Sequence, residues 1–67
     1  MLSDKALAVI EKLDLPLNLE EASEEELKSS IYALEDGEAL KYMGFDDDNI
    51  PEIEEAYMAL EKELLKR

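Results

Sequence analysis

The feature that most constrains the fold is that a chain of only 67 residues contains neither cysteine nor histidine. Below about 70–80 residues, one hydrophobic core rarely supplies more than about 3–5 kcal/mol, so small domains usually add disulfides, a metal or very regular helix packing. Without cysteine and histidine, disulfides and the usual ligands of a structural zinc ion are missing. Regular helix packing remains, and the many Ala, Leu, Glu and Lys residues favour it.

The first predicted helix spans residues 4–13. Ser3 is its predicted N-cap, and its apolar residues recur every three or four positions, which places them on one face. We expect the helix to stop before Pro16, because the residue ahead of a proline avoids the helical region. Residues 14–22 are interpreted as an extended connector whose alternating leucines pack down over the helices: Leu15, Leu17 and Leu19.

The second predicted helix spans residues 24–35 and has the clearest start signal in the chain. Ser23 and Glu26 form a capping box, in which each side chain accepts a hydrogen bond from the backbone N–H of the other residue. The Asp36-Gly37 pair is predicted to break this helix.

A short third helix is predicted over residues 38–43 and a long last helix over 51–65. Gly44 tolerates the left-handed conformation that ends helices, and Phe45 beyond it can fold back in a Schellman-type contact. Pro51 suits a first helical turn, where its missing N–H is not needed. The whole chain is therefore predicted to be a single all-α domain, a small bundle of three to four helices.

The acidic balance excludes two classes of partner. Nineteen acidic residues against seven basic ones give a formal net charge of −12. Nucleic acids and anionic membranes are bound mainly through Lys and Arg, so we expect neither as a direct partner. The apolar run at residues 6–10 is too short for a transmembrane segment or a signal peptide, and we expect a cytoplasmic or recombinant protein.

Catalysis and metal binding are not expected either. The chain has no imidazole base, no Ser-His or Cys-His pair and no Gly-rich phosphate loop, so we expect no enzyme, no catalytic residue and no cofactor. The run from Asp46 to Asn49 fails the EF-hand pattern, because Pro51 stands at the sixth position and Tyr57 at the twelfth. We interpret this run as a solvated leader of the last helix and predict no metal site.

One six-residue motif carries a family resemblance. Leu40-Lys41-Tyr42-Met43-Gly44-Phe45 resembles the L-x-x-M-G-F signature of ubiquitin-associated domains. In that family the Met-Gly-Phe loop and a dileucine at the end of the third helix contact ubiquitin. The resemblance therefore implies a contact set of Met43, Gly44, Phe45, Leu64 and Leu65. The chain departs from the family in having one long helix after the loop, where the family has two short ones.

Two broader resemblances concern origin and mode of action. The Ser23–Leu27 segment and the acidic run before the last helix are similar to the small immunity proteins that block colicin nucleases through acids and tyrosines on neighbouring helices. The Asn49–Tyr57 and Ala59–Arg67 segments resemble computationally designed helical mini-proteins, with Pro in the first turn, acids first and bases last. These resemblances imply, respectively, an inhibitor of a basic surface and a designed binder.

Our main functional hypothesis is a non-catalytic module that binds another protein. Its candidate contacts are aromatic and methionine residues beside the predicted core stripes, namely Tyr32, Tyr42, Met43, Phe45, Tyr57 and Met58. Such residues are enriched at the centres of interfaces, although a core this small has a competing use for them.

An alternative hypothesis is an acidic inhibitor that mimics nucleic acid and covers a basic partner surface. Its candidate contacts are Glu20, Glu21, Glu24, Glu25, Asp46, Asp47 and Asp48. The two hypotheses predict different salt behaviour, since only charge mimicry loses affinity steeply as salt rises. A designed fold with no partner, or a homo-oligomer, is the remaining alternative.

Overall fold

The computed structural model describes residues 2–67, in which the chain forms four α-helices and two short 3₁₀ turns. In chain order these are α1 (Asp4–Lys12), η1 (Leu19–Glu21), α2 (Glu24–Glu35), α3 (Gly37–Tyr42), η2 (Asp47–Asn49) and α4 (Ile50–Leu65). Within the described range no residue lies in a strand, so the all-α prediction is confirmed. Each predicted helix boundary lies within one residue of the observed one.

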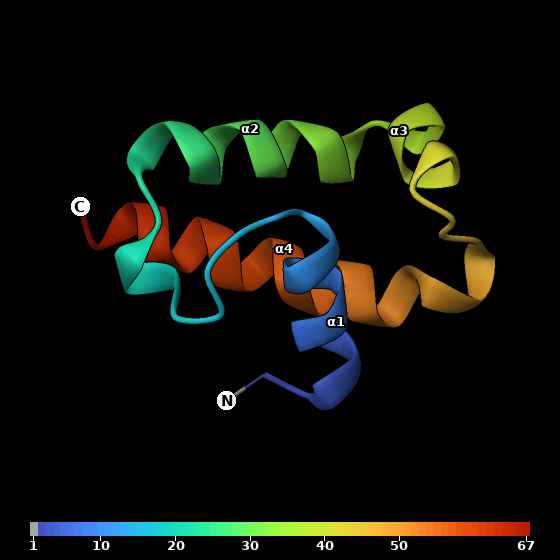
Figure 1. The fold of residues 1–67 in the computed structure, drawn as a ribbon, viewed down its shortest axis with the longest axis horizontal. Coiled ribbons are helices and arrows are strands. Elements are labelled where there is room, and N and C mark those ends of the chain that lie inside the picture. The colour runs from blue at the N-terminus through green and yellow to red at the C-terminus, as the bar shows by residue number, and fades with distance from the viewer. Residues whose placement is uncertain (1) are drawn as a thin grey trace.

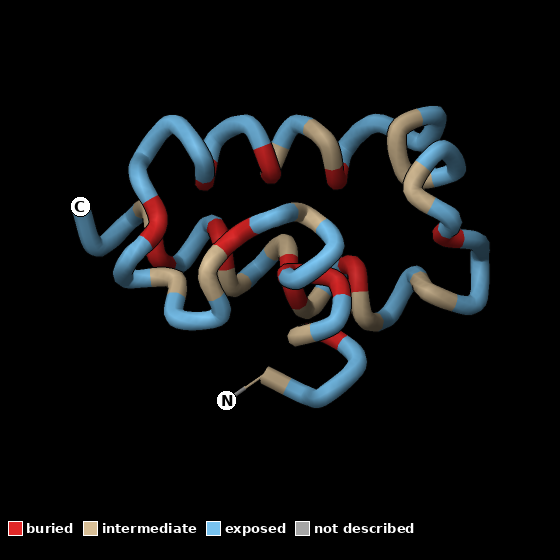
Figure 2. The backbone as a smooth tube through the Cα atoms, in the orientation of Figure 1, coloured by how far each residue is buried: buried red, intermediate tan, exposed pale blue. Residues whose placement is uncertain are grey.

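Helix α4 is the central element of the bundle. Figure 1 shows α1 crossing α4 while α2 runs alongside α4 in the opposite direction, and both helices pack against it. Helix α3 packs against α2 at one end of the molecule. The buried side chains gather where these elements meet (Figure 2): Val9, Ile10, Leu15, Ala22, Leu27, Leu34, Phe45, Ile53, Ala56 and Leu60.

Helix α1 begins as predicted, with the side chain of Ser3 capping its first turn. Its end is made by a Schellman motif two residues before Pro16. Asp14 has a φ of 63°, and the Leu15 N–H donates to the Ile10 carbonyl at 3.3 Å. A left-handed conformation costs a non-glycine residue about 1–2 kcal/mol, and Asp is among the residues that tolerate it best. Burial of Leu15 directly after this turn favours the arrangement.

The connector after α1 is not extended throughout, and this part of the sequence prediction was wrong. The Asn18 side chain accepts the N–H of the residue two positions on, and this bond starts the 3₁₀ turn η1. Only two of the three leucines pack against the core. Leu15 is buried and Leu19 is half-buried, whereas Leu17 is 57% exposed. The arginine side chain of Arg67 holds η1 in place by donating to two of its carbonyls, at 3.2 Å each.

Helix α2 starts with the predicted capping box. The Ser23 N–H donates to a Glu26 carboxylate oxygen at 3.0 Å, and the Glu26 N–H donates to the Ser23 hydroxyl oxygen at 3.1 Å. Asp36 then ends α2 and at the same time caps α3, whose first residue is Gly37. The predicted break is therefore a single non-helical residue.

The turn after α3 and the start of α4 also match the sequence prediction. Gly44 has a φ of +92°, and the Phe45 N–H donates to the Leu40 carbonyl at 3.0 Å, which is the long bond of a Schellman motif. Pro51 lies in the first turn of α4. Over residues 2–67, none of the helices combines the length and the apolar character that crossing a membrane requires.

Candidate functional site

The six residues predicted to bind a protein partner do not form one surface. Tyr32, Tyr42 and Met58 are exposed, at 72%, 94% and 62%. Phe45 is buried in the core, and Met43 and Tyr57 are half-buried against it, so these three are packing residues first. Tyr42 lies on α3 at one end of the molecule, away from the middle of α2 and α4, where Tyr32 and Met58 lie.

Phe45 and Met43 are held by a contact between the ends of α1 and α3. The Lys12 ammonium lies 4.8 Å from the centre of the Phe45 ring, a cation–π distance. The same ammonium donates to the Met43 carbonyl at 3.4 Å, where it complements the negative end of α3. The Schellman contact predicted from Gly44-Phe45 therefore explains why Phe45 is unavailable to a partner.

Tyr57 joins α4 to α2 through its hydroxyl group. The hydroxyl donates to a Glu35 carboxylate oxygen at 2.6 Å. This hydrogen bond, with smaller contributions from burial and from the charges of Glu35 and Glu61, raises the pKa of Tyr57 to about 12. Tyr57 thus fixes the spacing of α2 and α4 beside a surface on which other apolar residues are exposed.

That surface is the side of the α2–α4 pair that α1 and the connector leave uncovered. A hollow of about 340 Å³ lies there between the two helices, lined by Ile31, Glu61, Leu64 and Leu65. Consecutive residues of a helix do not share a face, so Tyr32 lies on the solvent side of α2, where it is 72% exposed, while Met58 shares a line of α4 with Glu61 and Leu65. We call this surface the α2/α4 face and define it as the lining of the hollow, together with two residues exposed on the outer sides of the same helices: Ile31, Glu61, Leu64 and Leu65, with Tyr32 and Met58.

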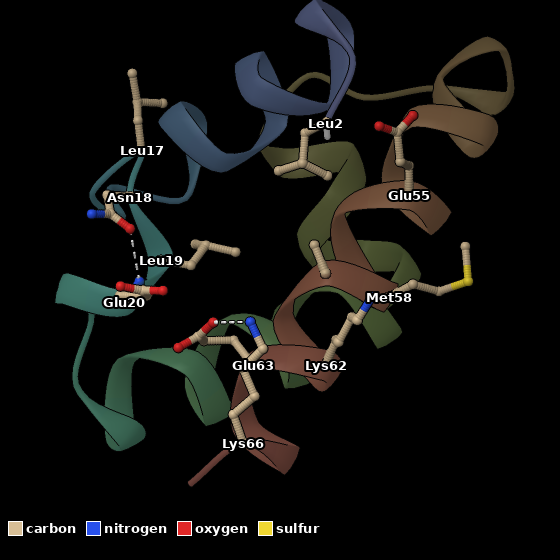
Figure 3. A pocket seen from close by; sticks show the side chains of 11 residues that line it. Leu2, Leu17, Asn18, Leu19, Glu20, Glu55, Met58, Lys62, Glu63 and Lys66 are labelled. Atoms are coloured by element: carbon tan, nitrogen blue, oxygen red, sulfur yellow. Dashed lines mark hydrogen bonds and ion pairs between the residues drawn. The ribbon is translucent and has the colours of Figure 1, made fainter.

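A second hollow, of about 610 Å³, lies along the other edge of α4, between that helix and the connector. We call it the connector groove; its lining includes Leu2, Leu17, Leu19, Met58 and Ala59. Figure 3 shows Leu19 pointing into this groove, whereas Leu17 and Met58 extend away from its centre. Met58 therefore lies at the boundary between the connector groove and the α2/α4 face.

Three charged groups of the connector groove, Glu55, Glu63 and Lys66, contact other residues of the same chain. Glu55 accepts hydrogen bonds from the Ser3 N–H at 2.6 Å and from the Ser3 hydroxyl at 3.0 Å. Glu63 is buried and lies 3.6 Å from the Arg67 guanidinium and 3.8 Å from the Lys66 ammonium. These contacts tie both ends of the described chain to α4.

The acidic residues of the alternative hypothesis are divided between the two ends of the molecule. Four of them lie in η1 and the first turn of α2: Glu20, Glu21, Glu24 and Glu25. The other three, Asp46, Asp47 and Asp48, lie in and beside η2 at the opposite end (Figure 1). The contact set implied by the ubiquitin-associated resemblance is divided in the same way, because α4 separates Met43 from Leu64 by its full length.

The pKa values of Glu26 and Tyr57 are shifted by their hydrogen bonds. The backbone N–H and then the hydroxyl of Ser23 lower the pKa of the Glu26 carboxyl, while the hydrogen bond to Glu35 raises that of Tyr57. Neither shift moves a group toward neutral pH, where a general acid or base works best. Within residues 2–67, no three acidic side chains are grouped closely enough to hold a metal ion.

Sequence reasoning misplaced one leucine and overestimated the availability of Phe45. Leu17 was expected to pack over the helices, yet it is 57% exposed, and Phe45 is only 8% exposed. Leu65 is 87% exposed, and its spacing from Met58 indicates this position from the sequence, since residues seven apart share a line on a helix. Comparison with protein-family models, with curated proteins and with solved structures finds no match for this chain.

Proposed function

We propose that this chain is a non-catalytic protein-binding module that docks through the α2/α4 face. The observation that carries the proposal is the apolar hollow between α2 and α4, lined by Ile31, Leu64 and the 87% exposed Leu65. Tyr32 and Met58, 72% and 62% exposed, lie on the outer sides of the same two helices. On small monomers, a contiguous apolar patch marks a contact surface more often than a single exposed apolar residue does. Tyr and Met are also enriched at the centres of interfaces.

The framework beneath this face suits a binding role. Ile31, Tyr57 and Leu64 pack against the core on one side and border the face on the other. The Tyr57–Glu35 hydrogen bond joins the two helices, so the apolar groups are held on rigid elements. A rigid helical surface loses little conformational entropy when a partner covers it.

The test compares three exposed positions at which a Glu substitution leaves the core intact. Tyr32→Glu and Leu65→Glu each place a charge in the α2/α4 face, while Tyr42→Glu is the matched control on α3. Immobilised chains are incubated with a mixed lysate, and captured proteins are quantified by mass spectrometry. We expect a captured protein to fall at least tenfold with the first two variants and to be retained by the third, because an unpaired charge is costly to bury.

Circular dichroism spectra and thermal melts of the three variants check that each remains folded. If Tyr32→Glu and Leu65→Glu retain every captured protein at the wild-type level, the α2/α4 face is not the binding surface. If a captured protein is lost only with Tyr42→Glu, its interface lies on α3, and this result would also contradict the proposal.

A further inference from the structure

The α2/α4 face has the shape of a groove between two antiparallel helices. Its floor is formed by Ile31 and Leu64, and Leu65 and Glu61 border it on the α4 side. Grooves between packed helices receive the side-chain ridge of another helix, and amphipathic helices are recognised in this way. Helix α4 has 16 residues, so a partner helix of about 16 residues, about 24 Å long, would match its length.

The charge around this groove is acidic and largely uncompensated. Glu54 and Glu61 flank the face on α4, and Glu35 borders it on α2. The three ion pairs within residues 2–67 use only Glu24 and Glu63 as acids. The nearest cation on α2, Lys28, is the partner of Glu24 at 3.3 Å.

The same charge argues against a second copy as the occupant. Each copy carries a net charge of −12, and two such faces would bring like charges together across the contact. Lys62 and Lys66 line the connector groove, and Lys66 is already paired with Glu63 at 3.8 Å. Two cations do not offset the acids that two facing copies would bring together.

We infer that the partner bound by the α2/α4 face is an amphipathic helix with an apolar stripe and a basic flank. The stripe fills the hollow over Ile31, Leu64 and Leu65, and the Lys and Arg residues beside it pair with Glu54 and Glu61. This inference rests on the proposed function and adds the chemistry of the partner to it. The apolar contacts supply most of the affinity, while the charges select the partner and speed association.

The test uses two labelled peptides of about 16 residues, matched in length to α4. Both carry the same leucine stripe; one has Lys beside the stripe and the other has Glu. Binding is followed by fluorescence anisotropy at about 0.1 M salt, where the Debye length is about 10 Å. We expect the basic peptide to bind at least tenfold more tightly than the acidic one, and Leu65→Glu to weaken it by a similar factor.

A pair of charge variants separates local recognition from the effect of net charge. Glu61→Lys and Asp47→Lys change the net charge equally, but Asp47 lies in η2 at the far end of the molecule. Exposed charges beyond a Debye length of about 10 Å are largely screened at moderate salt. We therefore expect Glu61→Lys to reduce the preference for the basic peptide at least fivefold, and Asp47→Lys to change it less than twofold.

Three results would overturn the inference. If the acidic peptide binds as tightly as the basic one, the partner does not need a basic flank. If Glu61→Lys and Asp47→Lys have equal effects, the basic peptide is attracted by net charge alone. If the wild type sediments as a dimer and Leu65→Glu sediments as a monomer, the occupant of the face is a second copy of the chain. The failure of the proposed function is distinguishable, because in that case capture from the lysate does not respond to Tyr32→Glu or Leu65→Glu.

Discussion

The α2/α4 face and the connector groove lie on opposite edges of the same helix, and both are lined by leucines. They differ in what their charged groups contact. In the connector groove, Glu55 accepts two hydrogen bonds from Ser3, and Arg67 donates to two carbonyls of η1. On the α2/α4 face, the charge of Glu61 has no cationic partner among residues 2–67.

This difference separates an edge that closes the fold from an edge that is open to other molecules. Segments far apart in sequence meet in the connector groove, so its polar groups act within the chain. The α2/α4 face joins only two helices, and its exposed side chains extend into solvent. Volume alone therefore does not identify a binding site, since the larger hollow is the one in which Glu55 and Glu63 already bind groups of the same chain.

The largest expected effect comes from substituting two leucines of α4 that lie on different sides of the helix. Leu60 is 0% exposed and Leu65 is 87% exposed. We expect Leu60→Ala to lower the free energy of unfolding by about 2–5 kcal/mol, which is comparable with the whole stability of a domain this small. Leu65→Ala should change it by less than about 0.5 kcal/mol. Urea denaturation followed by circular dichroism measures both.

A large loss of stability in Leu65→Ala would mean that this side chain belongs to the core. The α2/α4 face would then lose its most exposed apolar group, and the contrast between the two edges of α4 would weaken. A small loss in Leu60→Ala would contradict the packing of the bundle itself.

A smaller effect is expected from the arginine that joins the end of the chain to η1. Arg67→Ala removes two hydrogen bonds to η1 and the ion pair with Glu63 at 3.6 Å. We expect a loss of about 1–2 kcal/mol, because hydrogen bonds from charged donors contribute more than neutral ones. Lys66→Ala is the matched control: its ion pair with Glu63 is longer, at 3.8 Å, and the Lys66 side chain is 60% exposed.

The control should change the free energy of unfolding by less than about 0.5 kcal/mol, as exposed ion pairs usually do. Equal effects of Arg67→Ala and Lys66→Ala in urea denaturation would mean that the bonds to η1 contribute nothing measurable. Both variants should bind the basic peptide as the wild type does, since they leave the α2/α4 face unchanged.

The parts of the fold that could be predicted from the sequence are those decided by neighbouring residues. The capping box of Ser23 and Glu26 and the Schellman turn at Gly44 need only residues within one or two turns of each other. Such motifs satisfy the backbone groups at a helix end locally, and the sequence therefore shows them directly. The left-handed turn at Asp14 is equally local, but Asp is a weaker signal than Gly, and Pro16 gave a simpler reason for the helix to end.

The parts that could not be predicted depend on contacts between distant residues. Leu15 and Leu17 both alternate with polar or proline residues, yet only Leu15 is buried in the core, and Arg67 fixes the η1 turn that follows from the other end of the chain. Tyr57 belongs to the apolar stripe of the last helix, whereas Tyr32 lies one step beside that of the second, but the sequence does not show what the Tyr57 hydroxyl binds. Tyr57 is distinguished by Glu35, which lies 22 residues earlier and across the contact between α2 and α4.

The smallest expected effect concerns the hydrogen bond between Tyr57 and Glu35, and it depends on pH. The pKa of Tyr57 in the folded chain is raised from 10.0 to about 12 by this bond. A group whose pKa is raised on folding contributes stability that is fully present below its unfolded pKa and is lost as the pH rises through its folded pKa. The contribution of the protonated hydroxyl is therefore constant below about pH 10 and disappears between about pH 10 and pH 12.

We expect Tyr57→Phe to be less stable than the wild type at neutral pH, and the difference between the two to shrink across that window. Thermal melts of both chains at a series of pH values measure it, and comparing the two cancels the titration of the other groups. Tyr32→Phe is the control at neutral pH, since no protein group within residues 2–67 binds the hydroxyl of Tyr32. A difference that stays constant through pH 12 would mean that the hydroxyl does not join α2 to α4. The α2/α4 face would then lack a hydrogen bond that joins its two helices, while the connector groove would keep the hydrogen bonds of Glu55 to Ser3.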